Sequence, residues 1–153
     1  MASVEIRTQL AILYDAVSDV RRMGDWSPEC RRCEWLREWT GPVVGARFKG
    51  KNQHGLFRWS TKCTVVVADP GREFAFVTSH LGQDATRWSY RFEATSHHIT
   101  VTETFEMLSD MPWYLRFVDR HLMRLKDRKV DLEANMQRTL QELKASMEGL
   151  VLS

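Results

Sequence analysis

The chain has 153 residues, of which 43% are hydrophobic and 27% charged, with a net charge of +2. This size predicts one domain with its own core, and the interspersed charges offer no strong field for nucleic acid. No apolar run approaches the ~20 residues of a membrane span. The first residues carry no basic start or apolar signal core, and three cysteines favour a reducing compartment. We expect a cytoplasmic protein.

The first third of the chain predicts a strand and two short helical pieces. Val4, Ile6 and Thr8 alternate with charged residues, which is typical of a half-buried strand. Apolar residues at helical spacing over 10–20 predict a short helix, and a second helical turn follows over 20–23. Residues 32–38 predict a weak strand before the turn at Gly41-Pro42.

From residue 46 to 107 the hydrophobic period is two, interrupted by turn signals such as Asp69-Pro70-Gly71. Consecutive strands joined by short turns predict an antiparallel meander with one apolar face. The predicted inward row comprises Ala46, Phe48, Gly50, Phe57, Trp59, Thr61, Cys63, Val65, Val67, Phe74, Phe76, Thr78, Trp88, Tyr90, Phe92, Ile99, Val101, Glu103, Phe105 and Met107.

The C-terminal stretch, roughly 110–152, predicts one long amphipathic helix. Its apolar residues recur at steps of three and four, from Leu115 to Leu150. Asp110 and Pro112 are suited to a helix start. The stripe is interrupted by charge at Arg128 and Lys129, and about forty residues of helix would span about 60 Å. We therefore expect a bend or break within 120–129.

These elements predict an α+β fold in which about six or seven antiparallel strands curve around the long C-terminal helix. The helix cannot contact the whole concave face of a twisted sheet. The sequence therefore predicts a hydrophobic cavity between the helix and the sheet.

Six stretches carry a resemblance to a known family: 18–30, 41–52, 59–60, 70–76, 86–92 and 101–105. Their most characteristic motifs are Gly24-Asp25-Trp26-Ser27-Pro28 and Pro70-Gly71-Arg72-Glu73-Phe74. On these residues the chain resembles the START-like helix-grip superfamily, and within it the polyketide cyclase/dehydrase (SRPBCC) branch of bacteria. The resemblance covers nearly the whole chain and implies the helix-grip fold. It implies either a binder of hydrophobic ligands or an aromatase/cyclase. The proline usual ahead of the first helix is replaced here by Thr8-Gln9-Leu10-Ala11.

Glu103 is the most informative single residue, because it stands between Val101 and Phe105 in an apolar row. A lone buried carboxylate is costly, so it should be paired, hydrated or protonated. Arg128 and Lys129 of the facing helix are the predicted partners. The functional hypothesis is that Glu103 orients a polar ligand group or acts as a general base. The alternatives are a structural ion pair, or a bulge that turns Glu103 outward.

The remaining reactive side chains predict no cofactor and no metal site. Cys30 and Cys33 form a C-x-x-C motif, but no second pair of ligands follows, so we interpret them as incidental thiols. The histidines form no metal or nucleophile motif, and His80 at a strand end is the only one retained as a weak site candidate. No nucleotide-binding or serine-hydrolase motif occurs.

Aromatic residues mixed with a few polar groups indicate a small-molecule site. The predicted ligand-binding residues are Trp26, Phe48, Trp59, Thr61, Phe76, Thr78, Trp88, Tyr90, Glu103, Phe105, Trp113 and Lys129. Weak catalytic candidates are Glu103, Tyr90 and His80.

We expect a monomer or homodimer that binds a hydrophobic small molecule (a lipid, polyketide-like or isoprenoid compound), without stable membrane insertion. The alternatives are a cyclase/dehydratase-type enzyme that uses a cavity carboxylate, and a protein-interaction module.

Overall fold

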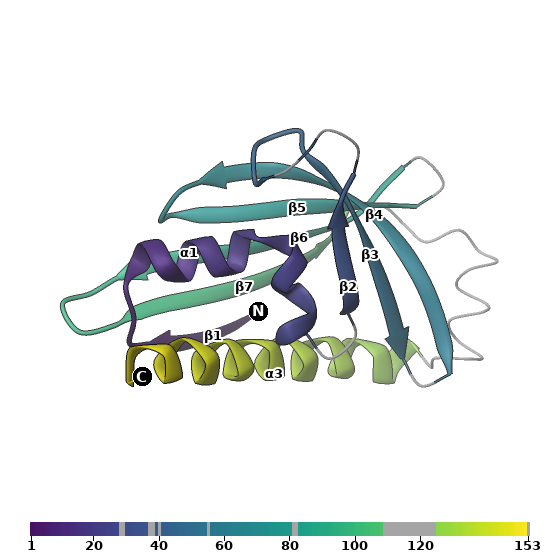
Figure 1. Ribbon diagram of the computed structural model, residues 1–153. Helices are drawn as coiled ribbons and strands as arrows, with labels where there is room; N and C mark the ends of the chain where they lie inside the picture. Colours follow the sequence, from purple (N-terminus) through teal and green to yellow (C-terminus); the bar gives the residue numbers. More distant parts are fainter. Residues whose placement is uncertain are drawn as a thin grey trace.

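The computed structural model describes residues 1–27, 30–36, 39, 41–54, 56–80, 83–108 and 125–152, with backbone only at 54, 57, 80, 125–131 and 150–152. The elements in chain order are β1 (Ala2–Ile6), α1 (Leu10–Ser18), the 3-10 helix η1 (Val20–Asp25), β2 (Cys30–Trp35), β3 (Arg47–His54), β4 (Phe57–Asp69), β5 (Glu73–His80), β6 (Gln83–Ala94), β7 (Ile99–Met107) and α3 (Leu125–Leu152) (Figure 1).

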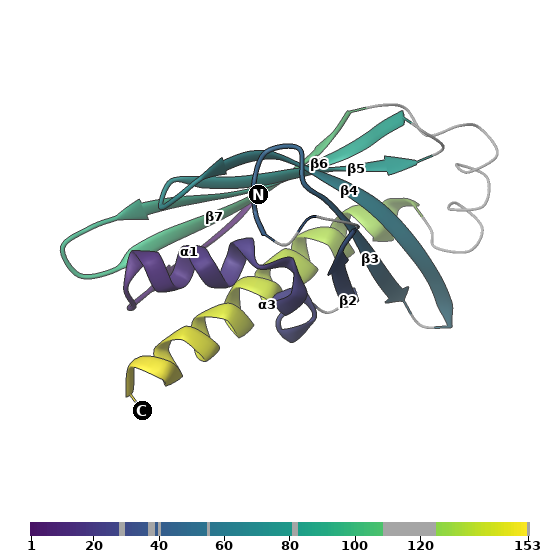
Figure 2. The same ribbon diagram turned by 45° about the horizontal axis from the view of Figure 1, so that its top comes forward.

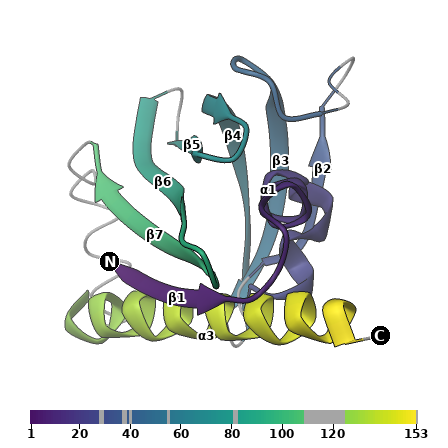
Figure 3. The same ribbon diagram turned by 90° about the vertical axis from the view of Figure 1, so that its left-hand side faces the viewer.

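All seven strands form one antiparallel sheet in the order β1-β7-β6-β5-β4-β3-β2. The chain therefore runs as a meander from β2 to β7, and β1 then joins the free edge of β7. The sheet curves, and α3 runs along its β1 edge while α1 and η1 lie inside the curve (Figures 2 and 3). The predicted α+β fold, a curved antiparallel sheet with a long C-terminal helix, is confirmed.

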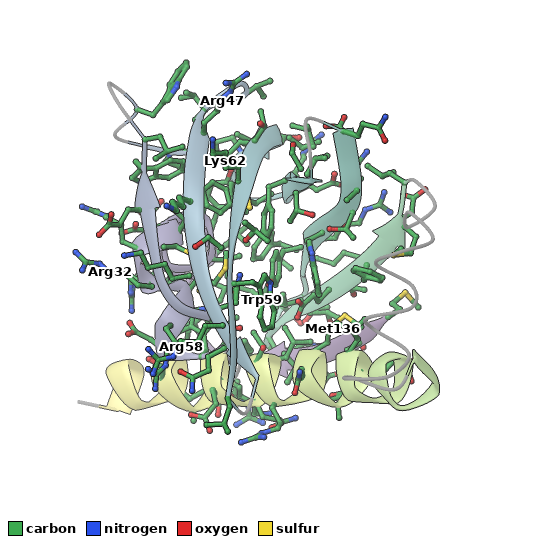
Figure 4. The ribbon with its side chains drawn as sticks, turned by 90° about the vertical axis from the view of Figure 1, so that its right-hand side faces the viewer. Arg32, Arg47, Arg58, Trp59, Lys62 and Met136 are labelled. Carbon is green, nitrogen blue, oxygen red and sulfur yellow. The ribbon has the colours of Figure 1, made fainter. Side chains whose placement is uncertain are left out.

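The core lies where α1 and α3 meet the concave face of the sheet. Four apolar residues of α3 follow each other at steps of four, three and four and are at most 3% exposed: Met136, Leu140, Leu143 and Met147. This spacing places them on one face of the helix, as predicted. Ile6, Leu13 and Phe48 complete the buried centre from the other side. Figure 4 shows Met136 pointing from α3 toward the sheet.

Two predicted inward positions differ from the structure. A bulge lies between Val65 and Val67, so Ala68 pairs with Phe74 and packs on the core, whereas Val67 pairs with Ala75. The extra residue shifts the alternation by one, which a strict period of two cannot anticipate. Met107 is 52% exposed because it ends β7, beyond the part of the sheet that the helices cover.

The predicted C-terminal helix is seen from Leu125 onward as α3, one continuous helix of 28 residues. The predicted helix start at Asp110 and the first half of the predicted bend lie outside the described residues. No bend interrupts the helix between Leu125 and Lys129. Among the described residues, no helix combines the length and apolar character needed to cross a membrane.

The turn of η1 packs closely on the backbone of β2. A Cβ atom at Gly24 would lie 2.8 Å from the carbonyl oxygen of Arg31, a distance that real Cβ atoms essentially never show. Glycine at position 24 therefore permits the approach of η1 to the edge strand.

We expect Gly24→Ala to lower the free energy of unfolding by about 1–3 kcal/mol, because the backbone of β2 must move to admit the methyl group. Gly41→Ala is the matched control, since no atom lies within 4 Å of the Cβ position there. Denaturant unfolding of both variants measures the difference. Equal stability of the two variants would contradict the close packing of η1 on β2.

Candidate functional site

The concave face of the sheet changes from buried to half-buried along its strands. On each of the strands β4 to β7, one inward residue is buried, and the inward residue two positions away from it is more exposed. Cys63 is buried and Thr61 half-buried, and Tyr90 is buried and Trp88 half-buried. The helices therefore cover one end of the face and leave the other end partly open.

The half-buried end of the face contains five of the predicted site residues. We call this set the aromatic end: Trp59, Thr61, Thr78, Trp88 and Phe105. Antiparallel register places Trp88 directly opposite Phe105 on β7. Thr78 lies opposite Cys63, two positions from Thr61, and Trp59 lies farther along β4. The rings of Trp88 and Phe105 meet edge to face, with centroids 4.8 Å apart. The half-buried part of the concave face therefore carries aromatic rings together with the hydroxyl groups of Thr61 and Thr78.

A hydrogen-bonded polar pair, Tyr90 and Glu103, lies beside the aromatic end, one step deeper in the same rows. The two residues are directly opposite each other on β6 and β7. The Tyr90 hydroxyl donates a hydrogen bond of 2.9 Å to Oε2 of Glu103. Glu103 is only 2% exposed, so its predicted inward orientation is confirmed and the outward bulge is excluded.

The environment of Glu103 favours the neutral acid. Burial raises its pKa to about 8, against an ordinary value of 4.5, and the hydrogen bond from Tyr90 opposes this rise only in part. Burial and then the charge of Glu103 raise the pKa of Tyr90 well above its ordinary value. Among the described residues, Oε1 of Glu103 has no hydrogen-bond partner. A protonated Glu103 can therefore donate a hydrogen bond, and its anion can accept a proton.

The partner of Glu103 differs from the sequence-based expectation. The side chains of Arg128 and Lys129 lie outside the described residues, so that ion pair stays a prediction. Tyr90 was a predicted site residue, but its bond to Glu103 was missed because it depends on the register of β6 against β7.

The other predicted wall residues occupy different places. Phe48 and Phe76 are buried in the core and meet edge to face at 5.1 Å. Trp26 ends η1, is buried in the same core, and carries the guanidinium of Arg22 at 5.1 Å from its ring. Trp113 lies outside the described residues, and for His80 only the backbone is described.

Two polar residues of the aromatic end were not predicted. Thr86 shares a hydroxyl–hydroxyl hydrogen bond with Thr78, and Asn52 donates one of 3.1 Å to Thr61. Thr86 lies two positions from Trp88, and Asn52 lies two positions from Gly50. Trp88 and Gly50 both belong to the predicted inward row. Extending the period of two by one step would have found both.

The Cys30 and Cys33 thiols lie together inside the fold. A regular strand would place residues three apart on opposite faces, but a bulge between Cys30 and Arg32 turns both inward. Their Sγ atoms are 3.1 Å apart. Within the described part of the chain, no group of three or more histidine, cysteine, aspartate or glutamate residues is arranged to hold a metal ion.

A hollow of about 360 Å³ lies where β2, β3 and β4 run side by side. Its lining is mostly basic and polar: Arg31, Arg32, Lys51, Asn52, Arg58, Trp59 and Ser60. Of the predicted wall residues only Trp59 takes part. This hollow therefore differs in chemistry from the apolar cavity that the sequence predicts beneath α3, which stays a prediction.

The fold is that of a helix-grip protein: a meander from β2 to β7, β1 paired with β7, and the long helix α3. Comparison with known proteins agrees with this fold. The chain belongs to the family described as polyketide cyclase/dehydrase and lipid transport, which matches residues 1–148. A search of curated proteins finds no match.

Three solved structures illustrate the likeness. The polyketide-cyclase-like protein Cgl2372 of Corynebacterium glutamicum is 28% identical over 98% of this chain and 91% of its own, with a TM-score of 0.67. The di-domain ARO/CYC StfQ of the steffimycin biosynthetic pathway is 15% identical with a TM-score of 0.75, and the match covers 99% of this chain and 51% of StfQ. Major latex-like protein 151 of Panax ginseng is 12% identical over 95% and 94% of the two chains, with a TM-score of 0.62. The last two share the fold.

The raised pKa of Glu103 predicts a stability that depends on pH. Between pH 4.5 and about 8 the folded protein holds a proton that the unfolded chain has released. The free energy of unfolding therefore falls as the pH rises through this window, by on the order of 3–5 kcal/mol. Glu103→Gln stays neutral and should remove this fall. Denaturant unfolding at several pH values measures it.

Glu93→Gln is the matched control, because Glu93 is exposed on β6 and its substitution should leave the pH dependence as in the parent protein. A Glu103→Gln protein that loses stability between pH 4.5 and 8 as steeply as the parent would show that Glu103 is not the group responsible.

Proposed function

We propose that this protein binds a hydrophobic small molecule, of the lipid, polyketide-like or isoprenoid class, against the aromatic end of its concave face. The observation that carries the proposal is the half-buried, edge-to-face pair of Trp88 and Phe105 beside polar groups. Large rings that remain partly exposed on a concave surface lose water when an apolar ligand covers them. Each Å² of apolar surface so buried contributes roughly 25 cal/mol.

The polar groups give such a ligand its orientation. Thr61 and Thr78 place hydroxyl groups between the aromatic walls, and Glu103 lies deeper with one oxygen that no described residue contacts. A ligand with an apolar body and one carbonyl or hydroxyl group would match this distribution. The family description, which includes lipid transport, agrees with this class of ligand.

Native mass spectrometry of the freshly purified protein, with identification of any co-purifying molecule, tests the proposal directly. Trp88→Ala and Phe105→Ala should each weaken binding of that molecule, or of the best binder in a lipid and polyketide panel, about tenfold or more. Ile12→Ala is the control, because Ile12 is 43% exposed on α1. An empty spectrum, with no thermal shift against the panel, would contradict the proposal and favour a protein-interaction module.

A second function is favoured by one observation, the neutral Glu103 held by Tyr90 next to the proposed ligand surface. A carboxyl group whose pKa is about 8 can give or take a proton near neutral pH. In a cyclase/dehydratase-type reaction it would donate a hydrogen bond to a substrate carbonyl oxygen, or take a proton from the adjacent carbon.

One variant, Glu103→Gln, distinguishes the binding function from the enzymatic one. A binding protein should keep its ligand affinity within a few-fold after Glu103→Gln, since amide and acid have similar shapes. An enzyme should show a bell-shaped dependence of turnover on pH and lose turnover by at least a hundredfold in the same variant. Turnover that survives the substitution would exclude Glu103 as the proton-transfer group.

A further inference from the structure

The outer face of β2, β3 and β4 concentrates positive charge. Six cationic side chains alternate with the inward row on these strands: Arg32, Arg47, Lys49, Lys51, Arg58 and Lys62. The acidic residues of the three strands are Glu34 and, at the far end of β4, Asp69. Figure 4 shows Arg32, Arg47, Arg58 and Lys62 spread over this face. The whole chain has a net charge of only +2, so the distribution is strongly asymmetric.

Among the described residues, most of these cations have no neutralising partner. Arg32 pairs with Glu34, but within the described part of the chain no carboxylate lies at ion-pair distance from Arg47, Lys49, Lys51, Arg58 or Lys62. Lys49 and Lys62 are directly opposite each other in the β3–β4 ladder. Like charges at opposite positions destabilise a sheet. On the outer face of β5 and β6, by contrast, Arg87 and Arg91 both pair with Glu73.

The hollow described above lies within this basic surface. Four cations contribute to its lining, Arg31, Arg32, Lys51 and Arg58, with the amide of Asn52 and the hydroxyl of Ser60 between them. Guanidinium and amide donors around one concavity suit the oxygens of a phosphate group. Its volume of about 360 Å³ is enough for such a group with its first substituents.

An exposed leucine lies at the turn between β3 and β4, close to the hollow. Leu56 is 101% exposed, and Trp59 and Asn52, which both line the hollow, lie three and four residues away from it. A fully exposed leucine beside several cations combines the two attractions that hold a protein at an anionic membrane surface: apolar insertion and attraction to lipid charge.

We propose that the β3–β4 turn and the basic hollow beside it form a reversible docking site for an anionic phospholipid bilayer, in which the hollow takes a phosphate headgroup and Leu56 enters the acyl boundary. The hollow shares Asn52 and Trp59 with the aromatic end, whereas Leu56, Lys51 and Arg58 lie outside that end. Substitutions at these three positions therefore test docking without altering Trp88 or Phe105, on which the proposed ligand function rests, so either proposal can fail alone.

Co-sedimentation of the full chain with phosphatidylcholine vesicles, with and without phosphatidylglycerol, tests the proposal. Binding should require phosphatidylglycerol and weaken with added salt, because the attraction is electrostatic. Each cation near an anionic surface contributes about fivefold to partitioning, so Lys51→Gln with Arg58→Gln should reduce binding about thirtyfold. Leu56→Ser should reduce it further by removing the apolar contact.

The matched control is Arg7→Gln with Arg72→Gln, which removes two exposed cations from other parts of the surface and gives the same net charge. Equal losses in the two double variants would show a charge effect without a site and overturn the proposal. Absence of binding to phosphatidylglycerol vesicles would overturn it as well, leaving an acidic protein as the partner of the basic face.

A competition experiment distinguishes a lipid headgroup from a soluble phosphate ester as the ligand of the hollow. Glycerol phosphate at millimolar concentration should displace the protein from vesicles only weakly, because it offers a single headgroup and no apolar phase. Full displacement, together with saturable binding of glycerol phosphate alone, would assign the hollow to a soluble phosphate ester and overturn docking on the bilayer. Thermal unfolding should show that all variants keep their fold, since the substituted side chains are exposed.

Discussion

The structure depends on how much of one curved sheet surface the helices α1, η1 and α3 can cover. The concave face must be hidden from water because its rows are apolar, yet α1, η1 and the buried stripe of α3 meet it mainly at one end. A sheet that twists and curves away cannot remain in contact with a straight helix along its length. The half-buried aromatic end follows from this geometry, since Trp88 and Phe105 extend the rows of β6 and β7 past the buried Tyr90 and Glu103.

The boundary between the covered and the open part of this face determines the chemistry of Glu103. In its row, Glu103 lies between the fully buried Val101 and the half-buried Phe105. At its actual position it is buried next to Tyr90, which satisfies one oxygen and leaves the other without a described partner. Desolvation therefore governs its protonation, so that the acid is neutral where an exposed glutamate would be charged.

Periodicity predicted the fold because alternation along the strands and the stripe on α3 are local properties of the sequence. It placed Glu103 inside and grouped Trp59, Thr61, Thr78 and Trp88 on one surface. It could not predict the bulges, which shift Ala68 inward and bring Cys30 and Cys33 to one face, because an extra residue leaves no periodic signal. Nor could it pair Tyr90 with Glu103, since register between strands is a property of the whole sheet. The alternating cations of β3 were visible in the sequence, but only the neighbouring strands reveal that no described carboxylate on them pairs with these cations.

The same alternation that builds the core also separates most of the two proposed surfaces, which meet at Asn52 and Trp59. On β4, Thr61 belongs to the inward row, while Arg58 and Lys62 face the opposite side. Because successive side chains of a strand point to opposite faces, the outer cations can change without altering the inward row. A hydrophobic ligand would therefore contact the inner residues of strands whose outer residues attract anionic lipid headgroups. This arrangement brings the aromatic end within one sheet thickness of the bilayer, the phase in which such a ligand is most soluble. A ligand that moves between the bilayer and the protein would then pass around the β3–β4 turn, where Leu56 lies. It would not have to cross the core.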